Sequence, residues 1–187
     1  MKITIISGSP RKASITVRVA KYLCDYFPQK YPAHHFDYIQ LNEVELPFIQ
    51  EVWSTLADVP DVYKKTAEKI FGADAFVLVT PEYNGSMSSA IRNLFDHFPK
   101  QHRKVFGIVT ASEGALGGIR AAVAMQNQIC AWFGIPSPHM LTVSQMTQKF
   151  SDDGKLLDEK FLHNIMTFTH EFIWLAEAVY QSKTHPR

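Results

Sequence analysis

Hydroxyl and guanidinium groups gather directly after the first apolar run of the chain. Residues 3–6 (ITII) read as a buried strand, and five polar donors follow it: Ser7, Ser9, Arg11, Ser14 and Thr16. A helix start presents unpaired backbone N–H groups and the positive end of the helix dipole, which favours an anion. Arginine can add a bidentate contact to a phosphate, and Gly8 lets the backbone turn tightly. Residues 7–16 therefore predict an anion site.

This segment matches neither of two common nucleotide-binding loops, and it also has a plain structural interpretation. It lacks the Gly-Lys-Ser/Thr of a Walker loop, and Gly8 stands alone, without the three glycines of a dinucleotide fingerprint. A plain structural alternative is that Ser9 or Ser14 caps the helix while Arg11 is solvated. Any single residue would fit that alternative, but the density of donors favours the anion site.

A second polar turn follows the apolar run 76–79. Pro81, Glu82, Tyr83 and Asn84 combine a rigid turn, a carboxylate, an aromatic face and an amide. A planar heterocycle is bound by such a mixture of groups. The alternative is an ordinary strand–helix turn, in which Asn84 and Gly85 make the bend and Ser86 caps the next helix. This segment alone leaves the two interpretations open.

The elements that would position these turns alternate along the chain. Expected strands are residues 3–7, 35–41, 75–80, 105–110 and 139–143, and expected helices are 14–27, 60–72, 86–98, 117–133 and 157–180. A long connection of residues 46–59, which includes Trp53, is expected to have a role at a neighbouring subunit or over a bound ring. Regular strand–helix alternation predicts an α/β protein whose parallel sheet is covered by helices on both faces. No interdomain linker is visible, so a single domain of residues 1–187 is expected.

Together the motifs GSPRKAS and PEYN, followed by Ile91-Arg92-Asn93 and Asp96, resemble the NADPH-dependent FMN reductase family. The likeness continues in residues 112–118 and 150–156. It implies a flavodoxin-like fold, a three-layer sandwich with a five-stranded parallel sheet in the order 2-1-3-4-5. It also implies FMN as cofactor and NADPH or NADH as hydride donor.

The resemblance assigns roles residue by residue. The FMN phosphate would be held by Ser9, Arg11, Ser14 and Thr16. The isoalloxazine ring would be bordered by Pro81, Glu82, Tyr83 and Asn84, with Ser112 and Gly114 as further candidates from a third loop. No protein acid or base is assigned, because hydride transfer would be carried by N5 of the flavin.

Four positions depart from the usual family pattern. Thr16 stands where Asn is common, Arg92 where Lys is common and His97 where Trp is common, and Ser88-Ser89 replaces Pro-Gly. These departures affect details of the phosphate contact and the substrate pocket, and they leave the fold expectation unchanged.

The function that follows is an FMN-dependent NAD(P)H oxidoreductase with a ping-pong mechanism. The acceptor would be a quinone or a similar flat oxidant, with azo compounds and metal oxyanions as further classes. Two alternatives stay open: a non-catalytic flavin-binding electron carrier or redox-responsive module, and a reductase that releases reduced FMN to a partner. A net charge of +1 argues against nucleic acid as a main partner.

Composition and the remaining reactive residues add limits. No apolar run approaches the roughly 18 residues of a membrane helix, and no signal peptide is visible, so a cytoplasmic protein is expected. The histidines lack the spacing of a metal site, and Ser112 lacks the G-x-S-x-G context of a hydrolase. Cys24 and Cys130 are both expected to be buried free thiols.

Self-association is expected from an apparent surplus of apolar side chains. Six lie on the last predicted helix (Ile165, Phe168, Phe172, Trp174, Leu175, Tyr180) and three on the helix after PEYN (Leu94, Phe95, Phe98). Large apolar patches are seldom left exposed, and symmetric oligomers commonly cover them. The resemblance also implies a homodimer or homotetramer with flavin sites near the subunit boundary. The alternative is that the last helix is buried by its own sheet and by residues 46–59.

Overall fold

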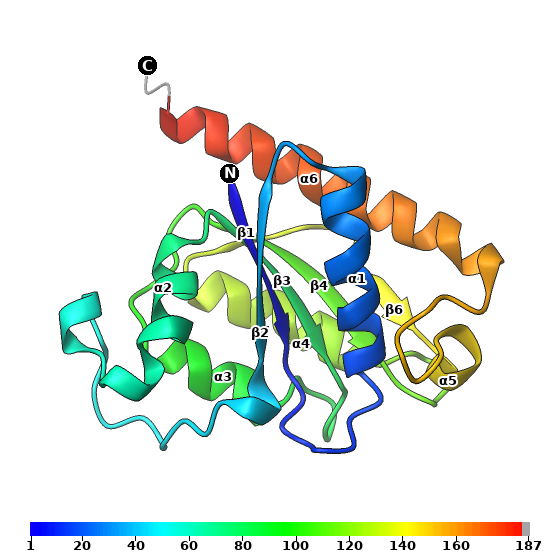
Figure 1. Ribbon diagram of the computed structural model, residues 1–187, viewed down its shortest axis with the longest axis horizontal. Coiled ribbons are helices and arrows are strands. Elements are labelled where there is room, and N and C mark those ends of the chain that lie inside the picture. Colours follow the sequence, from blue (N-terminus) through cyan, green and yellow to red (C-terminus); the bar gives the residue numbers. More distant parts are fainter. Residues whose placement is uncertain (185–187) are drawn as a thin grey trace.

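A parallel sheet forms the centre of the computed structural model, which describes residues 1–184 (Figure 1). Its strands are β1 (Lys2–Ser7), β2 (His35–Gln40), β3 (Ala75–Thr80), β4 (Val105–Ala111), β5 (Ile135–Pro136) and β6 (Leu141–Val143). Their order is β2-β1-β3-β4-β5, and β6 also pairs with β4. All pairings are parallel, so the predicted α/β class and the predicted strand order are confirmed.

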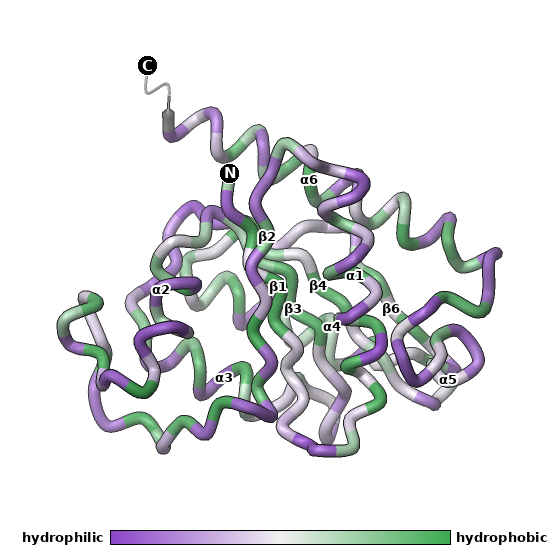
Figure 2. Tube along the Cα trace, in the orientation of Figure 1, coloured by the Kyte–Doolittle hydropathy of each residue, from purple (hydrophilic) through white to green (hydrophobic). Residues whose placement is uncertain are grey.

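Helices cover both faces of this sheet. They are α1 (Val17–Lys30), α2 (Lys64–Gly72), α3 (Ser89–Asp96), α4 (Ile119–Ala131), α5 (Met146–Lys149) and α6 (Leu162–Thr184). Side chains alternate along the strands: on β3, Val77 belongs to the core under α1 and α6, and Leu78 to the core on the side of α2, α3 and α4. The hydrophobic colour in Figure 2 accordingly follows the central strands. Among the described residues, no helix is long and apolar enough to cross a membrane.

The fifth strand departs from the prediction because it is broken. Its first piece pairs Ile135 with Val105, and its second piece pairs Leu141 with Val109. Four residues (137–140) separate the two pieces, whereas two (107 and 108) separate their partners on β4. The extra residues form a bulge in the fifth strand, which the hydrophobic pattern of the sequence does not predict. Pro136 therefore lies in the sheet.

Helix boundaries shift for local reasons. α1 begins at Val17, three residues after the predicted start, because residues 8–16 form an extended loop. α3 begins at Ser89, after the turn that precedes it, and α6 begins at Leu162, after a short 3-10 turn. Boundary shifts of this size are typical of sequence patterns, and here each one lengthens a loop near an end of the sheet.

Most of the apolar side chains that had suggested self-association are buried within the chain. Ile165, Phe168 and Phe172 are fully covered by the sheet and α1, and Leu94, Phe95 and Phe98 lie in the opposite core. The long connection of residues 46–59 packs on the α3 side, where Trp53 packs against His97 with 4.5 Å between ring centroids. It therefore does not cover α6, and Trp174 on that helix is 61% exposed.

The two cysteines lie in different environments. Cys24 on α1 is half-buried against the hydrophobic core, and burial, aided by Asp25, raises the pKa of its thiol to about 12. Cys130 is exposed on α4, so the prediction that both thiols are buried is wrong for this residue. Cys130 lies on the solvent side near the end of the helix, whereas its neighbour Ile129 is buried.

We expect iodoacetamide to modify one thiol in the folded protein. The thiolate is the nucleophile, and the raised pKa of Cys24 keeps it protonated at pH 8. Intact-mass measurement should show one adduct under native conditions and two in denaturant. Cys130→Ser should show none until the protein is unfolded. Two adducts on the native wild type would contradict this placement.

Candidate functional site

The predicted motifs meet at the carboxyl ends of β1, β3 and β4. Three loops leave the sheet there: residues 8–16, residues 81–88 and residues 112–118. The first two lie together at the lower edge of the sheet in Figure 1. Ligands of open α/β sheets bind at this end of the strands, where the chain leaves toward opposite faces.

The first loop leads into a helix whose N-terminus lacks a side-chain cap. Thr16 occupies the cap position, and its side chain accepts no hydrogen bond from the helix. Neither Ser9 nor Ser14 serves as the cap, so the structural alternative is wrong about the cap, whereas Arg11 is exposed as that alternative expected. The Ser14 hydroxyl is buried and has no hydrogen-bond partner among the described residues. An unpaired buried hydroxyl beside an uncapped helix start suits an anion such as a phosphate.

The second loop is held by a tight turn. Asn84 (φ 51°) and Gly85 (φ 77°) occupy left-handed conformations, and Tyr83 and Ser86 exchange backbone hydrogen bonds of 2.9 and 3.1 Å across them. The structural interpretation is thus right about the bend. It is wrong about the cap, because Ser88 accepts the Ile91 N–H at 3.3 Å, and Ser86 does not cap α3.

Gly8 packs against α3 with no room for a side chain. A Cβ at this position would lie 2.1 Å from Cδ1 of Ile91. The Gly8 N–H donates to the Val79 carbonyl at 2.7 Å, and the Ser88 hydroxyl donates to the Gly8 carbonyl. Gly8 does not adopt a positive φ, so its role is close approach between the loops and not the tight turn expected from the sequence.

The side chains of the two loops also touch. The Arg11 guanidinium carbon lies 4.6 Å from the centroid of the Tyr83 ring, and the Tyr83 hydroxyl lies 3.4 Å from the Ser9 hydroxyl. The sequence had assigned Arg11 to a phosphate and Tyr83 to a ring, as separate functions. In the structure, the Arg11 and Tyr83 side chains are in contact and form one surface.

Glu82 contacts the fourth strand–helix unit, at the start of α4. Its carboxylate accepts the Arg120 Nε–H at 3.0 Å and the Ala121 N–H at 3.4 Å. Gly118, at the cap position of α4, has no side chain to do this. Glu82 therefore caps α4 from a neighbouring loop, and its negative charge is paired with Arg120.

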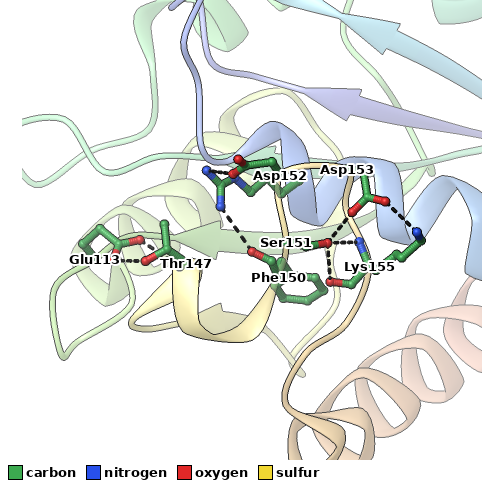
Figure 3. Close-up of polar contacts among 8 residues, drawn as sticks. Glu113, Thr147, Phe150, Ser151, Asp152, Asp153 and Lys155 are labelled. Carbon is green, nitrogen blue, oxygen red and sulfur yellow. Dashed lines mark hydrogen bonds and ion pairs between the residues drawn. The ribbon is translucent and has the colours of Figure 1, made fainter.

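The third loop is anchored by a hydrogen bond within the loop and by hydrogen bonds to α5. Its Ser112 hydroxyl donates to the Gly114 carbonyl at 3.3 Å. Glu113 accepts hydrogen bonds from the Thr147 N–H at 2.9 Å and from its hydroxyl at 2.8 Å, as Figure 3 shows. Arg18 on α1 reaches the Phe150 carbonyl and Asp152, so the segment after α5 is held against α1.

Two cavities open between these loops. The first, of about 250 Å³, is lined by Ser9, Arg11, Ala13, Ser14, Ile15, Thr16, Pro81, Glu82, Tyr83, Ala111, Ser112 and Glu113. It brings together eight of the ten predicted site residues. Asn84 instead lines a second cavity of about 600 Å³, which adjoins the first at Arg11 and Tyr83. Gly114 lies outside the lining of the first cavity.

Sequence reasoning missed several residues here. Glu113 and Arg120 act through partners that are far away in sequence, and no local pattern signals such pairs. Ser88 was noted only as a departure from the family's usual Pro, and it both caps α3 and holds Gly8. His97, another departure, packs against Trp53.

Known proteins resemble this chain in sequence. A family model described as NADPH-dependent FMN reductase matches residues 1–148. An NADPH azoreductase of Bacillus sp. (strain OY1-2) is 28% identical over 170 residues, which covers 89% of each chain. A quinone reductase of Pseudomonas putida is 27% identical over 166 residues, covering 84% of this chain and 85% of the relative.

Solved structures share the fold. A flavoenzyme NAD(P)H:(acceptor) oxidoreductase of Paracoccus denitrificans superposes with a TM-score of 0.73 at 21% identity, over 95% of this chain and 97% of that one. A flavodoxin from the domain Archaea gives a TM-score of 0.60 at 12% identity, over 96% and 99%. The fold is thus flavodoxin-like, as expected.

The Gly8 contact yields a stability prediction. We expect Gly8→Ala to destabilise the fold by about 1–3 kcal/mol through overpacking against Ile91. Ile91→Ala removes the obstructing atoms, at a cost of about 2–5 kcal/mol as a core truncation. Denaturant unfolding of the double variant should show less than the sum of the two losses. Additive losses would mean that the two residues do not press on one another.

Proposed function

Because this chain belongs to the NADPH-dependent FMN reductase family, we propose that it is an FMN-dependent NAD(P)H oxidoreductase whose acceptor is a quinone or a similar flat oxidant. The relatives named as azoreductase and quinone reductase support this acceptor class. The observation that carries the proposal is the cavity where the uncapped start of α1 meets the turn of residues 81–84.

The donor set of this cavity fits FMN. The buried, unpaired Ser14 hydroxyl and the start of α1, which has no side-chain cap, suit its phosphate, with Ser9, Arg11 and Thr16 beside them. Pro81, Glu82 and Tyr83 would border the ring, with Ser112 from the third loop. Asn84 would lie at the outer edge, toward the second cavity. When bound, FMN supplies the hydride transfer between NAD(P)H and the acceptor.

Self-association is part of this proposal. Its sequence argument is weakened by the burial of Ile165, Phe168 and Phe172. It now rests on apolar side chains that remain exposed, among them Phe48, Val62, Leu116 and Trp174.

Anaerobic spectroscopy of the purified protein tests the function. We expect a bound flavin whose absorption is bleached by NADPH or NADH and restored by a quinone. A protein that binds FMN but stays oxidised with both donors would be an electron carrier. A protein that loses FMN after reduction, on gel filtration, would be a reductase that releases its product.

Ser14 provides a test of the phosphate position. We expect Ser14→Ala to weaken FMN binding by about tenfold, because a hydrogen bond to a charged group contributes about 1.5 kcal/mol or more. Riboflavin, which lacks the phosphate, should bind as it does to the wild type. Lys12→Ala, exposed and outside this cavity, is the matched control and should bind FMN normally. Equal losses for FMN and riboflavin would remove the phosphate from Ser14.

The Glu82–Arg120 pair gives a second test, through the flavin potential. Reduction adds negative charge to the flavin, so Glu82→Gln, which leaves the Arg120 cation unpaired, should raise the midpoint potential. Arg120→Gln should lower it, because the carboxylate is then unpaired. For a two-electron couple, a shift of about 30 mV in the midpoint potential corresponds to a tenfold change in the equilibrium constant of reduction. The double variant should return toward the wild type, and shifts of one sign in both single variants would contradict this electrostatic role.

A further inference from the structure

The second cavity is larger than the one assigned to FMN and lies directly beside it. It has a volume of about 600 Å³ and lies between the turn after β3, the first half of α3 and the middle of α4. Its lining residues are Arg11, Tyr83, Asn84, Ser86, Met87, Ser88, Ser89, Arg92, Ala124 and Gln128. Arg11 and Tyr83 line both cavities, so a ligand in the second could reach a ring in the first.

The charges of this cavity are of one sign. Two arginines line it, and none of the described residues in its lining is Asp or Glu. Neither guanidinium has a hydrogen-bonded acceptor among the described residues: Arg11 rests on the Tyr83 ring, and Arg92 lies 3.9 Å from Asp96. Elsewhere, Arg120 is paired with Glu82 at 3.0 Å and Arg18 with Asp152. Among the described residues, Arg11 thus has only an aromatic contact and Arg92 only a long ion pair with Asp96, so both guanidinium groups keep N–H donors for an anion.

The position of these charges distinguishes between the two classes of reaction partner. A simple quinone is small and carries no anion, so it would use neither the volume nor the arginines. A nicotinamide dinucleotide carries its phosphates at a distance from its reactive ring. A cavity with cations beside the flavin site, and not inside it, matches that separation of ring and charge.

We propose that this cavity receives the phosphate-bearing part of the hydride donor, and that Arg92 contacts the 2′-phosphate and so makes the chain prefer NADPH to NADH. The assignment rests on the proposed function, because it presupposes a flavin in the adjoining cavity. Arg92 projects from α3 near its start, whereas Arg11 lies at the boundary with the flavin cavity. Arg92 is therefore the arginine placed for a group remote from the reactive ring.

Calorimetric titration of the FMN-loaded protein with adenosine 2′,5′-bisphosphate and with 5′-AMP tests the assignment. We expect the bisphosphate to bind the wild type about ten- to a hundredfold more tightly, since a charge-assisted contact to the 2′-phosphate is present only there. Arg92→Gln should abolish this difference and leave the binding of 5′-AMP unchanged. Arg92→Lys, which keeps the charge without the bidentate fork, should restore part of it.

Lys12→Gln is the matched control. Lys12 lines a different groove of about 350 Å³ between residues 41–48 and α3, which is the rival place for the nucleotide. The control should keep the full preference for the bisphosphate. In steady state, Arg92→Gln should raise the KM for NADPH, leave the KM for NADH unchanged and leave kcat unchanged.

Three outcomes would overturn the assignment: equal affinity of the wild type for both nucleotides, loss of the preference in Lys12→Gln, or its retention in Arg92→Gln. FMN titration of the same samples separates this failure from that of the proposed function. A wild type that binds FMN and oxidises both donors, but ignores the 2′-phosphate, would retain the function and lose only the role of Arg92. Failure to bind FMN would remove both.

Discussion

The close contact of the first loop with α3 is the constraint on which the site depends. Gly8 donates to the Val79 carbonyl at the end of β3 and accepts from Ser88, the cap of α3. The backbone of one loop is thereby fixed to the start of the next. Since a Cβ at residue 8 would overlap Ile91, only glycine allows this distance. The spacing between the proposed phosphate and ring positions follows from this contact.

The three helix starts at this edge of the sheet differ in how they are capped. The start of α3 is capped by Ser88 from its own turn, and the start of α4 by Glu82 from the preceding loop. The start of α1 has no side-chain cap, and the nearby Ser14 hydroxyl is unpaired. An anionic group is therefore stabilised most at α1. Under the proposed function, this asymmetry would orient FMN with its phosphate toward α1.

The sequence predicted the sheet well, because strands buried on both faces read as continuous apolar runs such as residues 76–79. Eight of the ten predicted site residues line one cavity, because residues that follow neighbouring parallel strands meet at one edge. Sequence reasoning failed where partners are remote in sequence. The pairing of Glu82 with Arg120 depends on tertiary placement alone, as does the contact that makes Gly8 necessary. The prediction of the fifth strand failed for another reason. A bulge changes the pairing register of a strand without changing its composition.

Arg11 couples the two cavities, and this affects how substitutions there are interpreted. Its guanidinium rests on the Tyr83 ring, and the Tyr83 hydroxyl lies beside Ser9. Removing Arg11 would take away a cation from both cavities and also release the aromatic wall between them. Effects of residues in such mutual contact do not add, so a loss at Arg11 cannot be divided between phosphate, ring and donor. Ser14 lines only the flavin cavity and Arg92 only its neighbour, and these two side chains therefore report on the two ligands separately.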